Sequence, residues 1–243
     1  MNDFWGFPTL VIASVVLLMM GLERANPLVR YVNDLIWYFR LLAVSVMGVF
    51  LTEWLGSVFE EHPNWHGLWQ SWFTLVPFVL KVSMGYLIVT FIVYWWHRMR
   101  HHSNWLWRLS HQIHHSTYRI QCLTALYAHP FDFLSTALIV NVVSYPLLGC
   151  DIKTALWINI TYSVFDFWEH CNVPTPHWLG YFIVRPEMHR IHHERNRHQM
   201  NFSLPIWDMM FGTYENPTRS VECGFSKTAE KRLGAMLLFK RVE

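Results

Sequence analysis

Five long apolar stretches constrain the fold of this 243-residue chain more than any other feature. A helix needs about 20 mostly apolar residues to cross a bilayer. The composition agrees with membrane insertion, because 53% of the residues are hydrophobic and only 15% are charged, against roughly 25% charged in soluble proteins. We therefore expect an all-α protein, a multi-span transmembrane bundle of about four to five helices. The fifth stretch, the shortest, is alternatively a core helix or a re-entrant helix. The stretches cover approximately residues 4–22, 35–59, 72–96, 131–149 and 152–168.

Basic residues predict the orientation of this bundle, because Lys and Arg concentrate in cytoplasmic loops. Arg24 and Arg30 lie between the first two stretches, and four arginines lie between the third and the fourth, whereas residues 60–71 contain no Lys or Arg. Of the 19 basic residues, 17 then fall on one side or at its boundary, the exceptions being Lys81 and Lys153. We expect the N-terminus outside and the C-terminal 75 residues in the cytoplasm.

The chain divides into three parts on composition. Residues 1–71 are expected to form N-terminal transmembrane helices. Residues 72–215 would form a catalytic domain, in which the remaining spans are followed by a proline-punctuated, partly helical cytosolic cap. Residues 216–243 would be a basic cytosolic tail. A net charge of +2 and the lack of a basic, aromatic-rich arm argue against a nucleic-acid partner.

Three histidine clusters carry the chemistry. In H-x-x-H-H the histidines are at i, i+3 and i+4, which places them on one face of a helix, where imidazoles can converge on a metal. About 0.06 such motifs are expected by chance at this histidine content, and the chain has two. The clusters are His97-Arg-Met-Arg-His101-His102, His111-Gln-Ile-His114-His115 and His189-Arg-Ile-His192-His193.

The expected topology brings every cluster, together with His129 and His170, to the cytoplasmic face, where they can meet. His62 and His66 fall in the outer loop and are expected on the surface. His177 and His198 are cytosolic, but they lie outside the repeated pattern, so a surface or supporting role is favoured for both.

About ten clustered imidazoles exceed the needs of one zinc ion, which takes three or four protein ligands. The H-E-x-x-H motif of zinc proteases is missing, because Arg98, Gln112 and Arg190 follow the leading histidines. Haem in a membrane bundle would require paired histidines in the middle of spans, whereas these crowd the ends. Non-haem iron remains, and two metals fit the number of histidines.

The motifs together resemble those of the fatty acid hydroxylase/sterol desaturase superfamily, in the same order, over roughly residues 86–214. Besides the three histidine clusters, the resemblance rests on Ala128-His129-Pro130-Phe131-Asp132, Glu169-His170-Cys171-Asn172, Asn201-Phe202-Ser203 and Trp207-Asp208-Met209-Met210-Phe211-Gly212-Thr213.

This resemblance implies an integral-membrane di-iron monooxygenase that hydroxylates a C–H bond of a lipid with O2, at a site on the cytoplasmic face. Catalysis would rest on His97, His111, His115 and His193. Zinc is a conceivable adventitious substitute for the two iron ions. Carried over residue by residue, the metal ligands would be His97, His101 or His102, His111, His114, His115, His170, His189, His192 and His193, with His129 as a further ligand.

Two departures from the family pattern stand out. The spacing from the first cluster to His111 is one residue longer than usual, which leaves His101 and His102 as alternatives. Asn201-Phe202-Ser203 replaces an Asn-aromatic-Gly turn. Nearby acids are candidates to hold the outer nitrogens of ligating histidines, although each is expected more often to be a solvated or capping acid: Asp132, Asp166, Glu169, Glu187 and Asp208.

Other functions stay open on the sequence. A desaturase of the same superfamily starts with the same hydrogen abstraction. A zinc-dependent membrane hydrolase or isomerase, or a metal transporter, is the competitor outside oxygen chemistry. The chain carries no flavin, haem or iron–sulfur motif, so an oxygenase would need an external electron donor, namely a reductase or a cytochrome b5-like or ferredoxin-like protein.

Overall fold

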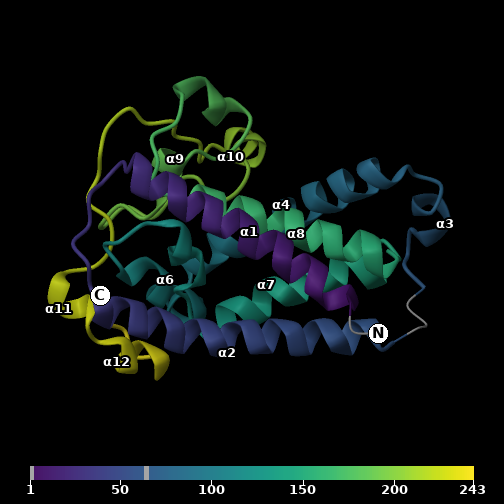
Figure 1. Ribbon diagram of the computed structural model, residues 1–243, viewed down its shortest axis with the longest axis horizontal. Helices are drawn as coiled ribbons and strands as arrows, with labels where there is room; N and C mark the ends of the chain where they lie inside the picture. Colours follow the sequence, from purple (N-terminus) through teal and green to yellow (C-terminus); the bar gives the residue numbers. More distant parts are fainter. Residues whose placement is uncertain (1–2, 63–65) are drawn as a thin grey trace.

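The computed structural model describes residues 3–62 and 66–243, and these are built from helices (Figure 1). No β-strand forms in these two ranges, where Glu194 and Cys223 make an isolated antiparallel bridge. The expected all-α fold is confirmed. The elements are α1 (Asp3–Ala25), α2 (Leu35–Glu60), α3 (Gln70–Phe73), α4 (Phe78–His102), α5 (Asn104–Leu106), η1 (Trp107–His111), α6 (Gln112–Ser116), η2 (Cys122–Leu126), α7 (Pro130–Val142), η3 (Val143–Leu147), α8 (Ile152–Glu169), η4 (His177–Tyr181), α9 (Pro186–His192), α10 (Pro205–Phe211), α11 (Lys227–Glu230) and α12 (Leu233–Leu237).

Five long helices form the bundle, and short elements gather at one of its ends. Helix α8 packs against both α1 and α4, while α2 packs against α7. Figure 1 shows the short elements α6, α9, α11 and α12 at the end opposite to α3 and the N-terminus. The chain therefore alternates between two ends of the bundle, and one end carries nearly all of the non-bundle structure.

Three helical segments are long and apolar enough to cross a membrane: α2, α4 and the continuous run of α7 and η3 over Pro130–Leu147. Their apolar side chains point outwards. Phe39 is 72% exposed, Leu42 61% and Phe50 64%, an apolar surface suited to lipid rather than water. The protein is thus a membrane protein. Helices α1 and α8 are not among these segments in the residues searched, so the expected four to five spans stays a prediction.

Close crossings between the long helices depend on glycine. A Cβ atom at Gly48 in α2 would overlap the ring of Phe133 in α7, and one at Gly85 in α4 would overlap Ile158 in α8. Small residues let membrane helices approach closely enough for extensive van der Waals contact. The second crossing joins α4, which carries His97 and His101, to α8, which ends before His170.

Proline sets several helix boundaries. Pro186 and Pro205, expected to punctuate the cap, each occupy the first turn of a helix, where the missing N–H costs nothing. Pro77 precedes α4, which begins at Phe78 and continues to His102. The expected span over 72–96 was therefore wrong in register by six residues, and the first histidine cluster is part of the helix itself.

The C-terminal segment packs against the bundle. Phe225 and Met236 are buried in one apolar cluster with Trp37 and Leu41 of α2 and with Ile113 of α6. Because Ile113 lies between histidines of the second cluster, this packing fixes α6 from behind.

Candidate metal centre

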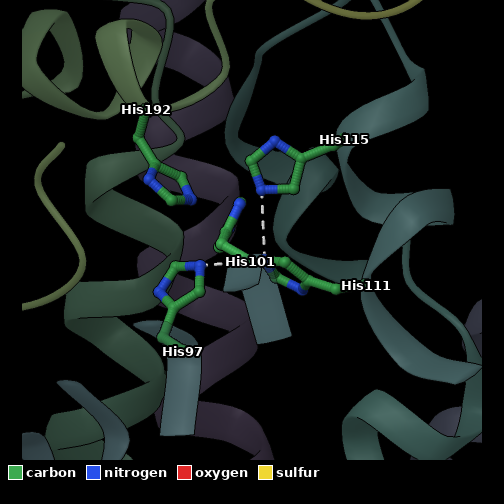
Figure 2. A group of neighbouring side chains, drawn as sticks. All are labelled: His97, His101, His111, His115 and His192. Carbon is green, nitrogen blue, oxygen red and sulfur yellow. Dashed lines mark hydrogen bonds between the residues drawn. The ribbon is translucent and has the colours of Figure 1, made fainter. Parts of the chain in front are cut away.

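Nine histidines converge in two neighbouring groups at the capped end of the bundle. In each group the nearest ring nitrogens all lie within 4.8 Å of one another. The first group is His97, His101, His111, His115 and His192, and the second group is His114, His170, His189 and His193. Figure 2 shows the rings of the first group turned towards a common centre.

Each H-x-x-H-H motif serves both groups. His111 and His115 belong to the first group, whereas His114 between them belongs to the second. On α9 the assignment is reversed, because His189 and its neighbour four residues on join the second group while His192 joins the first. The two short helices therefore face each other, and each contributes histidines to both groups. The rings of His115 and His193 stack with centroids 4.3 Å apart, which joins the groups.

A π-helical turn positions His111 in the first group. Residues Trp107–His111 form η1, which runs directly into α6. A π-turn accommodates one residue more than an α-turn, and such bulges are frequent at functional sites. The histidines that follow this turn on α6 face the site.

Ring nitrogens approach one another closely inside each group. In the first group, His111 Nε2 lies 2.8 Å from His97 Nε2 and 3.1 Å from His115 Nε2. In the second, His170 Nε2 lies 2.9 Å from His189 Nε2 and 3.1 Å from His114 Nε2. A neutral imidazole whose outer nitrogen carries the proton presents a lone pair on the inner one. Several lone pairs directed at one point are the donor set of a metal site.

Two further inner nitrogens support this reading. His101 Nε2 and His192 Nε2 are buried and, within the described ranges, have no hydrogen-bond partner. A buried polar atom without a partner is costly. A cation bound to the first group would satisfy both, so the residues present fit a metal.

Backbone carbonyls of one loop orient two histidines of the first group. His97 Nδ1 donates to the carbonyl of Phe202 at 2.7 Å, and His192 Nδ1 donates to that of Met200 at 2.8 Å. Asp208 shapes this loop, because its carboxylate accepts from the backbone N–H of Phe202 at 2.9 Å and of Ser203 at 3.1 Å. This is the segment in which the sequence departs from the family's usual glycine.

Carboxylates hold other outer nitrogens. Asp132 accepts from His111 Nδ1 at 2.8 Å, and Glu169 lies 3.3 Å from His189 Nδ1. The expectation of solvated or capping acids was wrong for these two residues. His170 Nδ1 donates to the backbone carbonyl of Asp166 at 2.7 Å. Such partners fix the tautomer and the ring orientation of metal-binding histidines.

Burial keeps the histidines neutral. Desolvation, reinforced by nearby histidines, lowers the pKa of His111, His114 and His115 well below the ordinary value, and Arg100 adds to the effect on His111 and His114. Desolvation also lowers the pKa of His192 to about 3. Metals bind the unprotonated ring, so the site is prepared for them at neutral pH.

Two of the eleven histidines predicted as ligands lie outside both groups. His102 is exposed on the outer side of α4, and its Nδ1 donates to the carbonyl of Arg98. His129 is buried but caps α7, where its Nδ1 accepts from the backbone N–H of Phe131 at 3.1 Å. His198, outside the repeated pattern, lies beside the first group with its ring 4.8 Å from that of His115.

A cavity of about 610 Å³ leads from the histidines into the bundle. Its walls include His97, His114 and His189 at one end and side chains of α1, α2, α4, α7 and α8 elsewhere. Ala13 of α1 and Val49 and Glu53 of α2 line it and are also exposed. The cavity therefore opens sideways between α1 and α2, on the lipid-facing surface.

Comparisons with known proteins agree with this geometry. The family described as "Fatty acid hydroxylase" matches residues 82–213, more than half of the chain. Ornithine lipid hydroxylase OlsE from Rhizobium tropici is 31% identical over 168 residues, which cover 66% of this chain and 50% of that protein. Human alkylglycerol monooxygenase is 29% identical over 194 residues, covering 77% of this chain and 40% of that protein.

A third relative is sphingolipid C4-hydroxylase from Schizosaccharomyces pombe, 27% identical over 159 residues, which cover 59% of this chain and 54% of that protein. The chain thus matches about half or less of the length of these curated relatives. No solved structure matches.

Proposed function

Because the chain belongs to the fatty acid hydroxylase family, we propose that it is a membrane-bound di-iron monooxygenase that hydroxylates a C–H bond of a lipid. The observation that carries this proposal is the set of nine inward-facing imidazoles, eight of them buried and that of His101 partly buried, at the end of a cavity that opens towards lipid. The names of the three relatives given above, two hydroxylases and a monooxygenase, support it.

The two histidine groups would each hold one iron ion. Bound iron would supply the activation of O2, since imidazole ligands with open coordination positions suit oxygen chemistry. The overall reaction consumes one lipid C–H bond, one O2, two electrons and two protons, and yields an alcohol and water. The electrons would come from an external reductase or a cytochrome b5-like or ferredoxin-like donor.

The protein's own contribution is position and exclusion of water. The outer contacts of His97, His111 and His189 keep their inner nitrogens fixed, which avoids reorganisation during turnover. Apolar side chains of α1 and α7 exclude water from the cavity, which protects reactive species from side reactions. The lateral opening admits a lipid chain directly from the bilayer.

We place this centre at the cytoplasmic face, on the strength of the basic residues that flank it. Residues 72–215 would then form the catalytic part, with 1–71 as further membrane helices and 216–243 as a segment that covers α6.

Metal analysis and lipid mass spectrometry together test the proposal. Protein isolated from iron-replete cells should contain two metal ions per chain, and cells that contain the protein should accumulate a lipid heavier by one oxygen. One metal or none, or a catalytically competent zinc protein that needs no O2, would overturn it. A lipid lighter by two hydrogens would instead identify a desaturase.

A further inference from the structure

Helix α8 presents a polar face to the cavity. Asn159, Tyr162, Ser163, Asp166 and Glu169 all line it. Their spacing of three and four residues places them on one side of the helix. This face ends at His170 of the second group, so it extends about 16 Å along the helix at 1.5 Å per residue.

Apolar side chains contribute much of the other walls. Val16 of α1, Val93 of α4, and Phe133, Ala137 and Val140 of α7 line the same cavity. Polar side chains also occur on these walls, namely Thr52 and Glu53 of α2, Thr90 and Arg100 of α4, and Asp132 and Thr136 of α7, but the polar residues of α8 form the longest continuous row.

The polar groups nearest the middle of the bundle are unused by the protein. Among the side chains that the structure describes, those of Asn159, Tyr162 and Ser163 have no hydrogen-bond partner. Thr161, on the same helix but outside the cavity, bonds instead to the carbonyl of Trp157 at 2.7 Å. Polar groups at membrane depth are costly unless they are satisfied. A ligand with polar atoms would satisfy those that face the cavity.

Building on the function proposed above, we propose that this face of α8 recognises the headgroup of the lipid substrate. The substrate class is a lipid with several adjacent hydroxyl, amide or amine groups close to the oxidised carbon, and not an unsubstituted hydrocarbon chain. Donors on the headgroup would meet the acceptor oxygens of Asn159, Ser163 and Asp166. The apolar chain would lie against α7 and leave between α1 and α2.

Binding of two matched probes tests this assignment. 1-Monopalmitoylglycerol and methyl palmitate share one acyl chain, but only the first carries free hydroxyls. Binding of each to the purified, metal-loaded full chain in detergent can be measured by native mass spectrometry. We expect the wild type to bind the glycerol ester roughly tenfold more tightly, which corresponds to one or two net hydrogen bonds.

Asn159→Leu and Ser163→Ala should each lower that preference by about three- to tenfold. Thr161→Val is the matched control, because it removes a hydroxyl from α8 that does not face the cavity, and it should leave the preference unchanged. Should Asn159→Leu fail to fold, as judged by thermal unfolding, the smaller Ser163→Ala change decides. Equal binding of both probes by the wild type, or an unchanged preference in a folded Ser163→Ala variant, would overturn the assignment.

Product analysis on iron-loaded samples of the same proteins, supplied with O2 and a reductant, separates this inference from the proposed function. A headgroup preference without any oxidised product contradicts the monooxygenase and leaves the recognition surface intact. Oxidation of both probes with equal efficiency, in wild type and variants alike, contradicts the recognition surface and leaves the monooxygenase intact.

Discussion

Asp132 accepts a 2.8 Å hydrogen bond from Nδ1 of His111. The same carboxylate is ion-paired with Arg100, which is itself buried. Arg100 precedes His101 on α4, and Asp132 lies in the first turn of α7. One carboxylate thus ties a histidine of the first group to two of the long helices.

We expect Asp132→Asn to weaken metal binding by about 10- to 100-fold, the usual cost of losing the partner of a metal-binding histidine. The amide keeps the shape of the side chain but does not fix the proton on His111 Nδ1. Metal content and lipid oxidation per folded protein are the measurements. Asp151→Asn, which retains a side-chain cap at the start of α8, is the control. Wild-type metal content and activity in Asp132→Asn would contradict the prediction.

Two adjacent histidines on α4 should behave differently. His101 is turned into the first group, with its ring 4.7 Å from that of His115, whereas His102 is exposed. We expect His101→Ala to lose bound metal and nearly all lipid oxidation, as should His111→Ala, His115→Ala and His193→Ala. His102→Ala should retain both. All variants should still insert into the membrane, because these residues lie at helix ends. Wild-type activity in His193→Ala, or equal losses in the two α4 variants, would contradict the assignment.

The metal-free protein should lose stability in mild acid. Burial lowers the pKa of His114, His189 and His193 in the folded state, whereas unfolded histidines titrate near 6.5. The unfolded chain therefore binds more protons below about pH 6.5, and the free energy of unfolding falls as the pH decreases. Thermal unfolding at pH 7.5 and pH 5.5 measures this, and an equal or higher midpoint at the lower pH would refute it.

Zinc provides the control for that measurement. Zinc should raise the unfolding midpoint at both pH values, but the loss between them should be at least as large, because a bound metal keeps the folded imidazoles unprotonated while the unfolded chain still takes up protons.

Several features of the site were readable from the histidine pattern, and others depend on tertiary contacts. The i, i+3, i+4 spacing identified α6 and α9 as ligand-bearing elements. It did not show that His114 and His192 turn to different groups from their neighbours, because that division arises where the two helices meet. The contacts of Asp132 with His111 and of Glu169 with His189 were not predictable for the same reason, since the partners are distant in sequence.

The boundary of α4 illustrates a second limit. Hydropathy alone begins the span at residue 72, but Pro77 delays the helix, and its continuation from His97 to His102 is polar except for Met99. The histidines extend the helix beyond its apolar part, which a window of hydropathy cannot detect.

Cysteine labelling tests the orientation of the protein in the membrane. We expect residues 60–71 on the non-cytoplasmic side and the C-terminal segment in the cytoplasm, because the expected topology puts 17 of the 19 basic residues on the second side or at its boundary. Ser71 and Ser226 are both exposed. In a Cys150→Ser background, a membrane-impermeant maleimide should label a Ser71→Cys variant in intact cells and a Ser226→Cys variant only after permeabilisation. The reverse labelling pattern would place the histidine groups on the non-cytoplasmic face and would contradict the prediction.

The opening between Ala13 and Glu53 faces the bilayer, so the substrate concentration that matters for the proposed reaction is the concentration within the membrane. A substrate that enters sideways never dissolves in water, so its encounter rate depends on its mole fraction among the surrounding lipids. Adding inert lipid at constant total substrate would then slow turnover by two-dimensional dilution, and enlarging the aqueous volume would not.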